Sequence, residues 1–471
     1  MFTVQIEELK EVKAIEEELK QGRGPVLIYG LVDSQKAHIA HYLMKKFNKI
    51  VLVVTPDDVE ARRIYEDLYS FNEGKAYLFP KRDVVFYKVA AASHEIVFER
   101  LKVIKGLCEE TPLAVVASID ALLDKLIPFN LFKKYQFRIK VGDKIELEDF
   151  SRKLQVMGYE RVQTVEGKGQ FSVRGGIIDI FPSTEEYPFR IELFDDEVDS
   201  LRVFDVMSQR SLNVVEEVFI FPATEFIVEE EHIKRGISTL SRDLNDYLSK
   251  IRKTKSGMAE KLKEKFDEIM EEISEGRKRE SIKVLINYFY ENPASLRDYV
   301  GNEAIVILDE TSRIKQRISN LELEFNENFK NLLERGEVIP EQKDIFFDYN
   351  KIVTDLKSNF LVIMNTLAKP EAEFHPQRIV NFVSRSMHSF HGKMDLLVED
   401  LKYYKSAGYK VLLLSGNKER AKILKDALQD YGIDSAVVED KEYDIQKGQV
   451  VIYPASVTKG FEYVDARFAV I

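Results

Sequence analysis

Short apolar strands alternate with amphipathic helical segments over residues 1–130, and this alternation is the strongest constraint on the fold. PVLIYG, KIVLVVTP, KAYLFP and LAVVAS are apolar, often β-branched runs bounded by Gly or Pro, which is typical of buried strands. SQKAHIAHYLMKKF and DDVEARRIYEDLYSF lie between them and have helical apolar spacing. Strands that alternate with helices pair in parallel, so we predict an α/β domain whose parallel sheet has helices on both faces.

The pattern changes three times after residue 130. Residues 131–225 alternate apolar and polar residues between Gly-containing turns, which predicts a small antiparallel β-rich domain inserted after the first sheet. Residues 226–350 read as a charged helical segment, with a long solvated helix around 252–275 and one strand, EAIVILDET, that completes the first sheet. Residues 351–471 return to an α/β pattern and predict a third domain. Because the last residues, RFAVI, read as a strand, we expect the chain to be part of a longer polypeptide.

Composition restricts the classes of protein. The chain has 471 residues, of which 45% are hydrophobic, enough to bury several cores. Its net charge of −11 argues against a surface that grips nucleic acid throughout, so any such contact would be local. A single cysteine, Cys108, excludes an intramolecular disulfide and favours a cytoplasmic location. Since no window approaches the roughly 18 consecutive apolar residues of a spanning helix, we expect no membrane contact.

Residues 26–37, VLIYGLVDSQKA, have the outline of a phosphate-binding loop. A strand is followed by Gly30 and then, four residues later, by Gln35-Lys36-Ala37, where Gly-Lys-Ser or Gly-Lys-Thr is expected. A working loop needs the second glycine so that backbone N–H groups can approach the phosphates, and a hydroxyl after the lysine to hold Mg²⁺. Gln35 crowds the first requirement and Ala37 fails the second. Taken alone, the segment fits an ordinary strand-to-helix turn in which Lys36 could still attract a phosphate.

The strand IVIL ends in Asp309-Glu310. Nucleoside triphosphatases place a metal-organising carboxylate and a base for water in this way, at the end of a buried strand beside the phosphate loop. Found together with the altered loop, the pair indicates the remains of a nucleotide-binding core. We therefore predict a degenerate nucleotide site with no catalytic residue.

The segment GYERVQTVEGKGQFSVRGGIIDIFPSTEEYPFRIELFDDEVDSLRVFDVMSQRS, residues 158–211, closely resembles a segment shared by the excision-repair subunit UvrB and the bacterial transcription-repair coupling factor (Mfd). In both, Arg-Gly precedes an Ile-Asp-Ile-Phe-Pro run, an Arg-Ile-Glu strand and a Gln-Arg-Ser tail. The altered loop separates the two, because UvrB has an intact loop whereas the N-terminal region of the coupling factor is a degenerate UvrB-like module. Residues 79–101 also lack the long aromatic hairpin with which UvrB-like proteins clamp DNA.

The resemblance implies that the β-rich domain recruits UvrA, the damage-scanning subunit, through basic side chains. It predicts partner-binding roles for Arg161, Lys168 and Arg174, with Phe181 as an apolar anchor, while Ser172 replaces a basic residue of UvrB. Strand alternation supports an outward position for Arg174, with Gln170 and Ser172 on the same face. The alternative is that the two arginines pair with acids of their own domain, such as Glu192, Asp195 and Asp196.

The resemblance further implies that the full-length family is a DNA translocase with ATP and Mg²⁺ as cofactors. For this chain it implies no cofactor. RNA polymerase and double-stranded DNA would be contacted by other parts of such a protein. We predict no metal site: the His-x-x-His pairs His38/His41 and His388/His391 offer no third ligand at a suitable spacing, so solvated or capping roles are expected.

Three functions remain open on the sequence. The first is an adaptor that binds UvrA. The second is a divergent UvrB-like DNA-dependent ATPase or helicase, against which Gln35 and Ala37 speak. The third is a DNA-binding module with a local basic patch, which the overall acidity and the missing hairpin disfavour.

Overall fold

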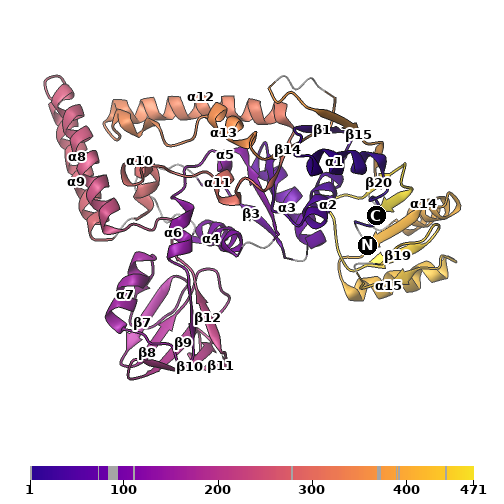
Figure 1. Ribbon diagram of the computed structural model, residues 1–471, viewed down its shortest axis with the longest axis horizontal. Helices are drawn as coiled ribbons and strands as arrows, with labels where there is room; N and C mark the ends of the chain where they lie inside the picture. Colours follow the sequence, from indigo (N-terminus) through magenta and orange to yellow (C-terminus); the bar gives the residue numbers. More distant parts are fainter. Residues whose placement is uncertain are drawn as a thin grey trace.

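The protein is described by a computed structural model, viewed in Figure 1. The described residues are 3–72, 74–82, 94–109, 112–276, 279–368, 373–388, 390, 393–440 and 443–471. The expectation about an aromatic hairpin falls largely on residues 83–93, which lie outside the described residues. Within these ranges no helix is long and apolar enough to cross a lipid bilayer.

A seven-stranded sheet forms the centre of the molecule, and all its strands are parallel. The spatial order is β15-β1-β14-β13-β2-β4-β3. The predicted fold class, α/β with a parallel sheet and further β-rich parts, is confirmed. The strands are β1 (Val26–Tyr29), β2 (Val51–Thr55), β3 (Ala76–Phe79), β4 (Ala114–Ser118), β13 (Ile305–Asp309), β14 (Phe360–Asn365) and β15 (Arg378–Asn381).

Alternate residues of these strands face two different cores. Val51, Val53 and Ile307 pack with the first group of helices, whereas Leu52, Val54 and Leu308 pack with the second. The inner strands are therefore buried on both faces, as their unbroken apolar runs require, whereas Val380 is the one buried residue of the edge strand β15. The first group is α1 (Lys10–Lys20), α2 (Gln35–Phe47) and α3 (Asp58–Asn72); the second is α4 (His94–Cys108), α5 (Ile119–Leu122), α12 (Thr311–Arg335) and α13 (Tyr349–Leu356).

Two strands lie in a different sheet from the one expected. The predicted return of EAIVILDET to the first sheet is confirmed, because β13 pairs with β2 and β14. β14 and β15, however, were assigned to a domain over residues 351–471, and both pair in the first sheet instead. The boundary at 350/351 is corrected accordingly: the separate sheet of the last segment begins at Ser384. Sequence pattern identifies an apolar strand but not the sheet that accepts it.

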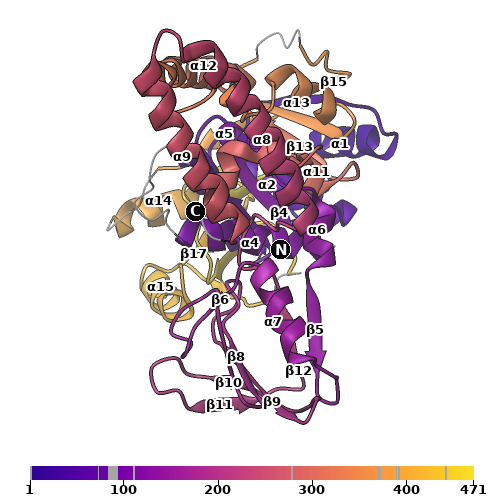
Figure 2. The same cartoon turned by 90° about the vertical axis from the view of Figure 1, so that its left-hand side faces the viewer.

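Two antiparallel strands, β5 (Phe137–Lys140) and β12 (Glu217–Ile220), connect the inserted β-rich domain to the rest of the molecule (Figures 1 and 2). Its six-stranded sheet has the order β11-β10-β9-β8-β7-β6. One face of this sheet packs on α7 through Phe150, Leu154 and Phe171. The remaining elements are α7 (Leu147–Val156), β6 (Glu160–Arg161), β7 (Gln170–Arg174), β8 (Ile177–Ile180), β9 (Phe189–Phe194), β10 (Glu197–Phe204) and β11 (Ser211–Val214).

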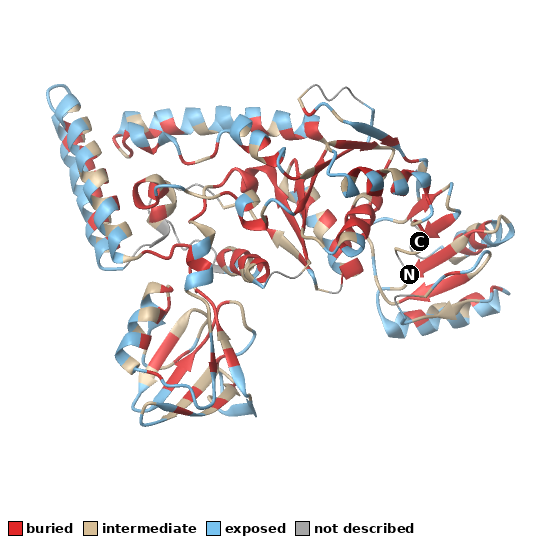
Figure 3. Ribbon diagram, viewed as in Figure 1, coloured by how far each residue is buried: buried red, intermediate tan, exposed pale blue. Residues whose placement is uncertain are grey.

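The predicted helix around 252–275 is confirmed as α9 (Ser256–Ser274), and it forms a helical hairpin with the preceding helix α8 (Glu230–Ile251). Arg252 is the C-cap of α8, and α9 begins four residues later. Gly236 lets α8 approach α10 (Ile286–Phe289), because an added Cβ would lie 2.5 Å from the ring of Phe289. Figure 3 shows an exposed outer surface on this hairpin. The short helices of this part of the chain are α6 (Phe129–Lys134), η1 (Arg279–Leu285), α11 (Leu296–Val300) and η2 (Pro340–Lys343).

The last segment forms a second α/β layer with the strand order β16-β20-β21-β17-β19-β18. One face packs on its own helices, and Phe461, Tyr463 and Phe468 on the other face join the core around α2. The elements are β16 (Ser384–Ser386), α14 (Met394–Ser406), β17 (Lys410–Leu414), α15 (Lys418–Asp430), β18 (Ala436–Val437), β19 (Val450–Tyr453), β20 (Phe461–Tyr463) and β21 (Phe468–Val470).

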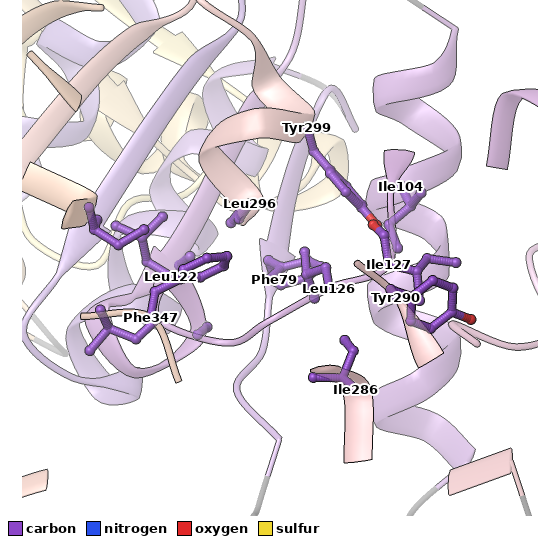
Figure 4. Packing of buried hydrophobic residues seen from close by; sticks show 14 of the residues in the cluster. Phe79, Ile104, Leu122, Leu126, Ile127, Ile286, Tyr290, Leu296, Tyr299 and Phe347 are labelled. Carbon is purple, nitrogen blue, oxygen red and sulfur yellow. The ribbon is translucent and has the colours of Figure 1, made fainter. Parts of the chain in front are cut away.

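A buried charge cluster joins the first sheet to the inserted domain. Arg100 of α4 is 1% exposed and donates from Nε to Glu225 at 2.6 Å and from Nη1 to Asp124 at 3.2 Å. Arg82 holds the other oxygen of Glu225 at 2.9 Å. Glu225 follows β12 on the way out of the inserted domain, so these contacts attach the base of that domain to α4. The apolar side chains around the cluster, including Phe79, Leu126 and Tyr299, are drawn in Figure 4.

The variant Arg100→Met should lower the apparent free energy of unfolding by about 3–5 kcal/mol, because it leaves two buried carboxylates short of a partner. Urea denaturation followed by circular dichroism measures the change. Lys102→Met, on an exposed position of the same helix, is the matched control and should stay within about 0.5 kcal/mol of the wild type. Similar losses in the two variants would show that the buried cluster does not stabilise the fold.

Candidate functional site

The altered phosphate loop has the backbone path of a tight strand-to-helix turn. Gly30 follows β1 with φ of 84°, and an added Cβ would lie 2.1 Å from the carbonyl oxygen of Phe382. Only glycine fits both restrictions. Asp33 also has a positive φ, 45°, and α2 begins two residues later at Gln35.

Gln35 fills the turn from inside. Its side chain is fully buried: Oε1 accepts from the backbone N–H of Val32 at 2.9 Å and Nε2 donates to the carbonyl oxygen of Glu462 at 3.2 Å. In a working loop, backbone N–H groups point at phosphate oxygens. Here an amide of the protein accepts one of those hydrogen bonds, so the crowding predicted at Gln35 takes the form of an internal substitute for the ligand.

Lys36 forms ion pairs with both carboxylates of the predicted nucleotide site. Its Nζ lies 2.5 Å from Asp309 and 2.9 Å from Glu310. Glu310 also accepts from the backbone N–H of Thr366 at 2.7 Å. Burial alone lowers the pKa of Lys36, but the two carboxylates outweigh it and raise that pKa. Burial likewise raises the pKa of Glu310, yet Lys36 and Thr366 more than compensate and leave it lowered. The lysine is thus held charged between two acids.

A loop of the last segment covers the start of α2. The N–H and hydroxyl of Thr458 donate to Asp67 at 2.6 and 2.9 Å, and Thr458 Oγ1 lies 3.2 Å from Ser34 Oγ. The N–H of Lys459 donates to Ser34 at 3.1 Å, and its Nζ lies 3.1 Å from Asp33. Sequence reasoning missed this loop, because its residues are between 391 and 425 positions from the residues to which they hydrogen-bond and carry no motif.

The structure therefore brings Lys36, Asp309 and Glu310 together as predicted. Ala37 lies in the first turn of α2 and is buried in the core. Lysine stands between two carboxylates, where it compensates their charge. The N–H of Val32 and the hydroxyl of Ser34 are engaged by the protein's own atoms. In chemical terms, ion pairs and hydrogen bonds connect the turn with β13 and with the last segment.

Arg161 and Lys168 line a cleft of about 1030 Å³ between the β-rich domain and the helical hairpin. Its other wall includes Glu230 of α8 and Glu275 at the end of α9. Arg161 is exposed. Lys168 lies 5.8 Å from the ring centroid of Phe181 and donates to the carbonyl oxygen of Ser183 at 3.4 Å. Burial, with Lys102 nearby, lowers the pKa of Lys168.

Arg174 lies apart from these two residues. Strand register aligns Arg161 with Phe171, a core residue of the domain. Because successive side chains of a strand alternate, Arg174 belongs to the opposite side of the sheet. Its Nη2 donates to the buried Asp179 at 2.7 Å, and its side chain remains half exposed. The alternative of pairing within the domain is thus realised for Arg174, with Asp179 as the acid.

Two expectations about side-chain positions need correction. Phe181 is 7% exposed and packs with Val165 and Phe204 in a small core, so it is not an exposed anchor; loops cover this part of the outer face. His38 and His41 are buried rather than solvated. Because α2 lies between two sheets, both of its faces are covered and even its histidines pack among aromatic rings.

Two further sets of side chains bear on the prediction of no metal site: a Glu/His cluster at the start of α8 and the pair His388/His391. Among the described residues, Glu229, Glu231 and His232 place potential ligand atoms within 4.8 Å of one another. Glu229 accepts from the hydroxyl of Tyr135 at 2.8 Å and pairs with Lys134. His232 Nδ1 accepts from the N–H of Glu229, so this group caps α8. His388 is exposed, whereas His391 lies outside the described residues.

A parallel α/β core is interrupted by a β-rich domain on a two-stranded neck. Residues 137–226, which contain that domain, match the family described as the UvrB interaction domain.

Over nearly its whole length the chain is similar to proteins named transcription-repair-coupling factor. It is 35% identical over 467 residues to that of Bacillus subtilis strain 168, covering 99% of this chain and 39% of the relative. It is 30% identical over 451 residues to that of Staphylococcus haemolyticus, covering 96% and 38%. The resemblance is confirmed: the chain is similar to the N-terminal region of the transcription-repair-coupling factors. It spans about two fifths of the length of these relatives.

Replacing Lys36 by Met should lower the apparent free energy of unfolding at pH 7 by about 3–5 kcal/mol, because Asp309 and Glu310 would repel each other without a cation. The loss should shrink as the pH falls from 7 toward 4, since protonation of the carboxylates removes the repulsion. In the wild type, the lowered pKa of Glu310 means that its contribution is present above its ordinary value of 4.5 and lost as the pH falls below it.

Urea midpoints of the wild type and of Lys36→Met, measured across this pH range, test the charge assignment. Lys49→Met removes a half-buried lysine that pairs with the exposed Glu303 at 2.7 Å and should change the midpoint little at any pH. A loss in Lys36→Met that is the same at every pH would contradict the proposed role of the carboxylates.

Proposed function

We propose that this chain is an adaptor that recruits UvrA, the damage-scanning subunit of nucleotide excision repair, to sites of stalled transcription. The observation that carries the proposal is the match of residues 137–226 to the UvrB interaction domain. The projecting position of that domain on its two-stranded neck supports it (Figure 2). Arg161 and Arg174 are exposed on the domain, and guanidinium groups suit partner recognition because they pair with carboxylates in two places.

The proposal includes an ATP site that has lost catalysis, so that the chain works without nucleotide or Mg²⁺. Two contacts and one residue type support this part. Gln35 accepts a hydrogen bond that a phosphate would accept, Lys36 is committed to two carboxylates, and Ala37 has no hydroxyl for a metal. The turn is retained as a scaffold for the surrounding elements.

The same proposal covers the cellular location of the chain and the division of activities between this chain and the rest of its longer relatives. We place the chain in the cytoplasm, where excision repair and transcription meet in bacteria. DNA translocation and contact with RNA polymerase are assigned to those parts of the relatives' length that this chain does not match, which makes the role of the present residues recruitment rather than movement along DNA.

The chain should bind purified UvrA, and the double variant Arg161→Ala/Arg174→Ala should weaken that binding at least about tenfold. Truncating a charge that is buried on binding costs about 2–5 kcal/mol, and each 1.4 kcal/mol is a factor of ten in affinity. Isothermal titration calorimetry measures the affinity, and circular dichroism checks that the variant is folded.

The matched control is Arg235→Ala/Arg242→Ala, which removes two exposed arginines of α8 and should leave the affinity unchanged. Equal weakening by both double variants would point to general charge attraction rather than a defined site. A wild-type chain that does not bind UvrA would overturn the recruiting role.

Titration with MgATP to about 1 mM, a concentration that reveals binding as weak as roughly −4 kcal/mol, should give no saturable heat. The physical reason is that the ligand would have to displace Gln35 from the turn and Lys36 from its ion pairs. Saturable binding would favour the alternative of a divergent UvrB-like ATPase, which a phosphate-release assay would then test.

A further inference from the structure

Asp179 on β8 is a fully buried carboxylate on the side of the β-rich sheet away from α7. Its Oδ2 accepts from Nη2 of Arg174 at 2.7 Å and from Nη2 of Arg190 at 2.9 Å, and its Oδ1 accepts from Nε of Arg190 at 2.7 Å. One buried acid therefore holds two guanidinium groups, and the cluster keeps a net positive charge.

The two arginines are held in different ways. Arg190 is the cross-strand neighbour of Asp179, its guanidinium lies 4.7 Å from the ring centroid of Phe204, and its side chain is 17% exposed. Arg190 donates through two nitrogens to the two oxygens of Asp179, and this bidentate pair suffices to compensate the buried charge of the carboxylate. Arg174 comes from the far end of β7, contributes through one nitrogen and leaves half its side chain accessible.

Ile177 is an accessible apolar side chain beside Arg174 on this face. It is the cross-strand neighbour of Arg174 and is 37% exposed. A cation next to an accessible apolar side chain fits a protein surface that carries a carboxylate beside an apolar group, because such a pair combines ion pairing with apolar burial.

We propose that Asp179 is a positioning residue, which fixes the guanidinium of Arg174 for contact with a carboxylate of UvrA. The proposal rests on the recruiting function above. A free arginine loses rotamer freedom when a partner binds, and one that is already anchored loses less, so anchoring strengthens binding without a new contact. Arg190 supports the arrangement by compensating the charge of Asp179 from the other side.

A double-mutant cycle in the full chain tests the proposal, with UvrA affinity measured for the wild type, Asp179→Asn, Arg174→Ala and the double variant. We expect Asp179→Asn to weaken binding about tenfold in the wild-type background and less than about twofold when Arg174 is already Ala, because residues in one network are coupled. The control is Asp196→Asn, which changes a half-exposed aspartate that pairs with Lys144 in the same domain, and it should have no effect.

The cycle separates positioning from a merely structural role. If Asp179→Asn weakens binding by disturbing the domain as a whole, the loss will be the same in both backgrounds, and the proposal is overturned. It is also overturned if Arg174→Ala weakens binding while Asp179→Asn does not, although recruitment of UvrA would then stand. A wild-type chain that fails to bind UvrA would remove both the recruiting function and this inference.

Discussion

The buried charge cluster around Arg100 is the constraint on which the arrangement of the other parts depends. It joins a helix of the first sheet to Glu225, where the chain leaves the β-rich domain, and to Asp124 beyond α5. Lys283, at the base of the helical hairpin, donates to the carbonyl oxygen of Arg82 at 3.1 Å, and burial lowers the pKa of Lys283 to about 8. Because buried charges tolerate little displacement, these contacts fix where the inserted domain and the hairpin leave the sheet.

The turn at residues 30–37 is held by contacts within the protein. The backbone bends at Gly30 and leads into a helix, and several polar groups of the turn have internal partners. Gln35 accepts from a loop amide, Lys36 joins two carboxylates, and Thr458 with Lys459 covers Ser34. The turn thereby connects the first sheet with the last segment, which gives its shape a structural role.

The β-rich domain differs from the α/β core in being a separate unit. It has its own core, projects from the molecule on two strands, and carries basic side chains on more than one side. Arg161 and Lys168 face the cleft toward the helical hairpin, whereas Arg174 stands on the sheet with Asp179 beneath it. A partner that contacted both groups would have to reach around the edge strand β6. The domain can therefore present a surface without any change in the α/β core.

Much of the fold and part of the site could be predicted from the sequence. The apolar runs identified the strands of the first sheet, and Lys36, Asp309 and Glu310 were expected to meet because the carboxyl ends of parallel strands share one edge. Segment 158–211 carried enough of a motif to indicate the UvrB-like family. These features depend on local pattern and on general rules of sheet construction, which a sequence states directly.

Tertiary structure alone decided the remaining points. An apolar strand such as β14 has the same pattern in either sheet, so its assignment to the first sheet required knowledge of its neighbours. The burial of Phe181 and His38 depends on loops and strands that cover them from distant positions in the chain. The pairing of Thr458 with Asp67, and of Arg174 with Asp179 rather than another acid, also follows from three-dimensional placement. The sequence by itself determined which elements form and which family they resemble, whereas only packing between distant segments decided which polar groups are left to meet a partner.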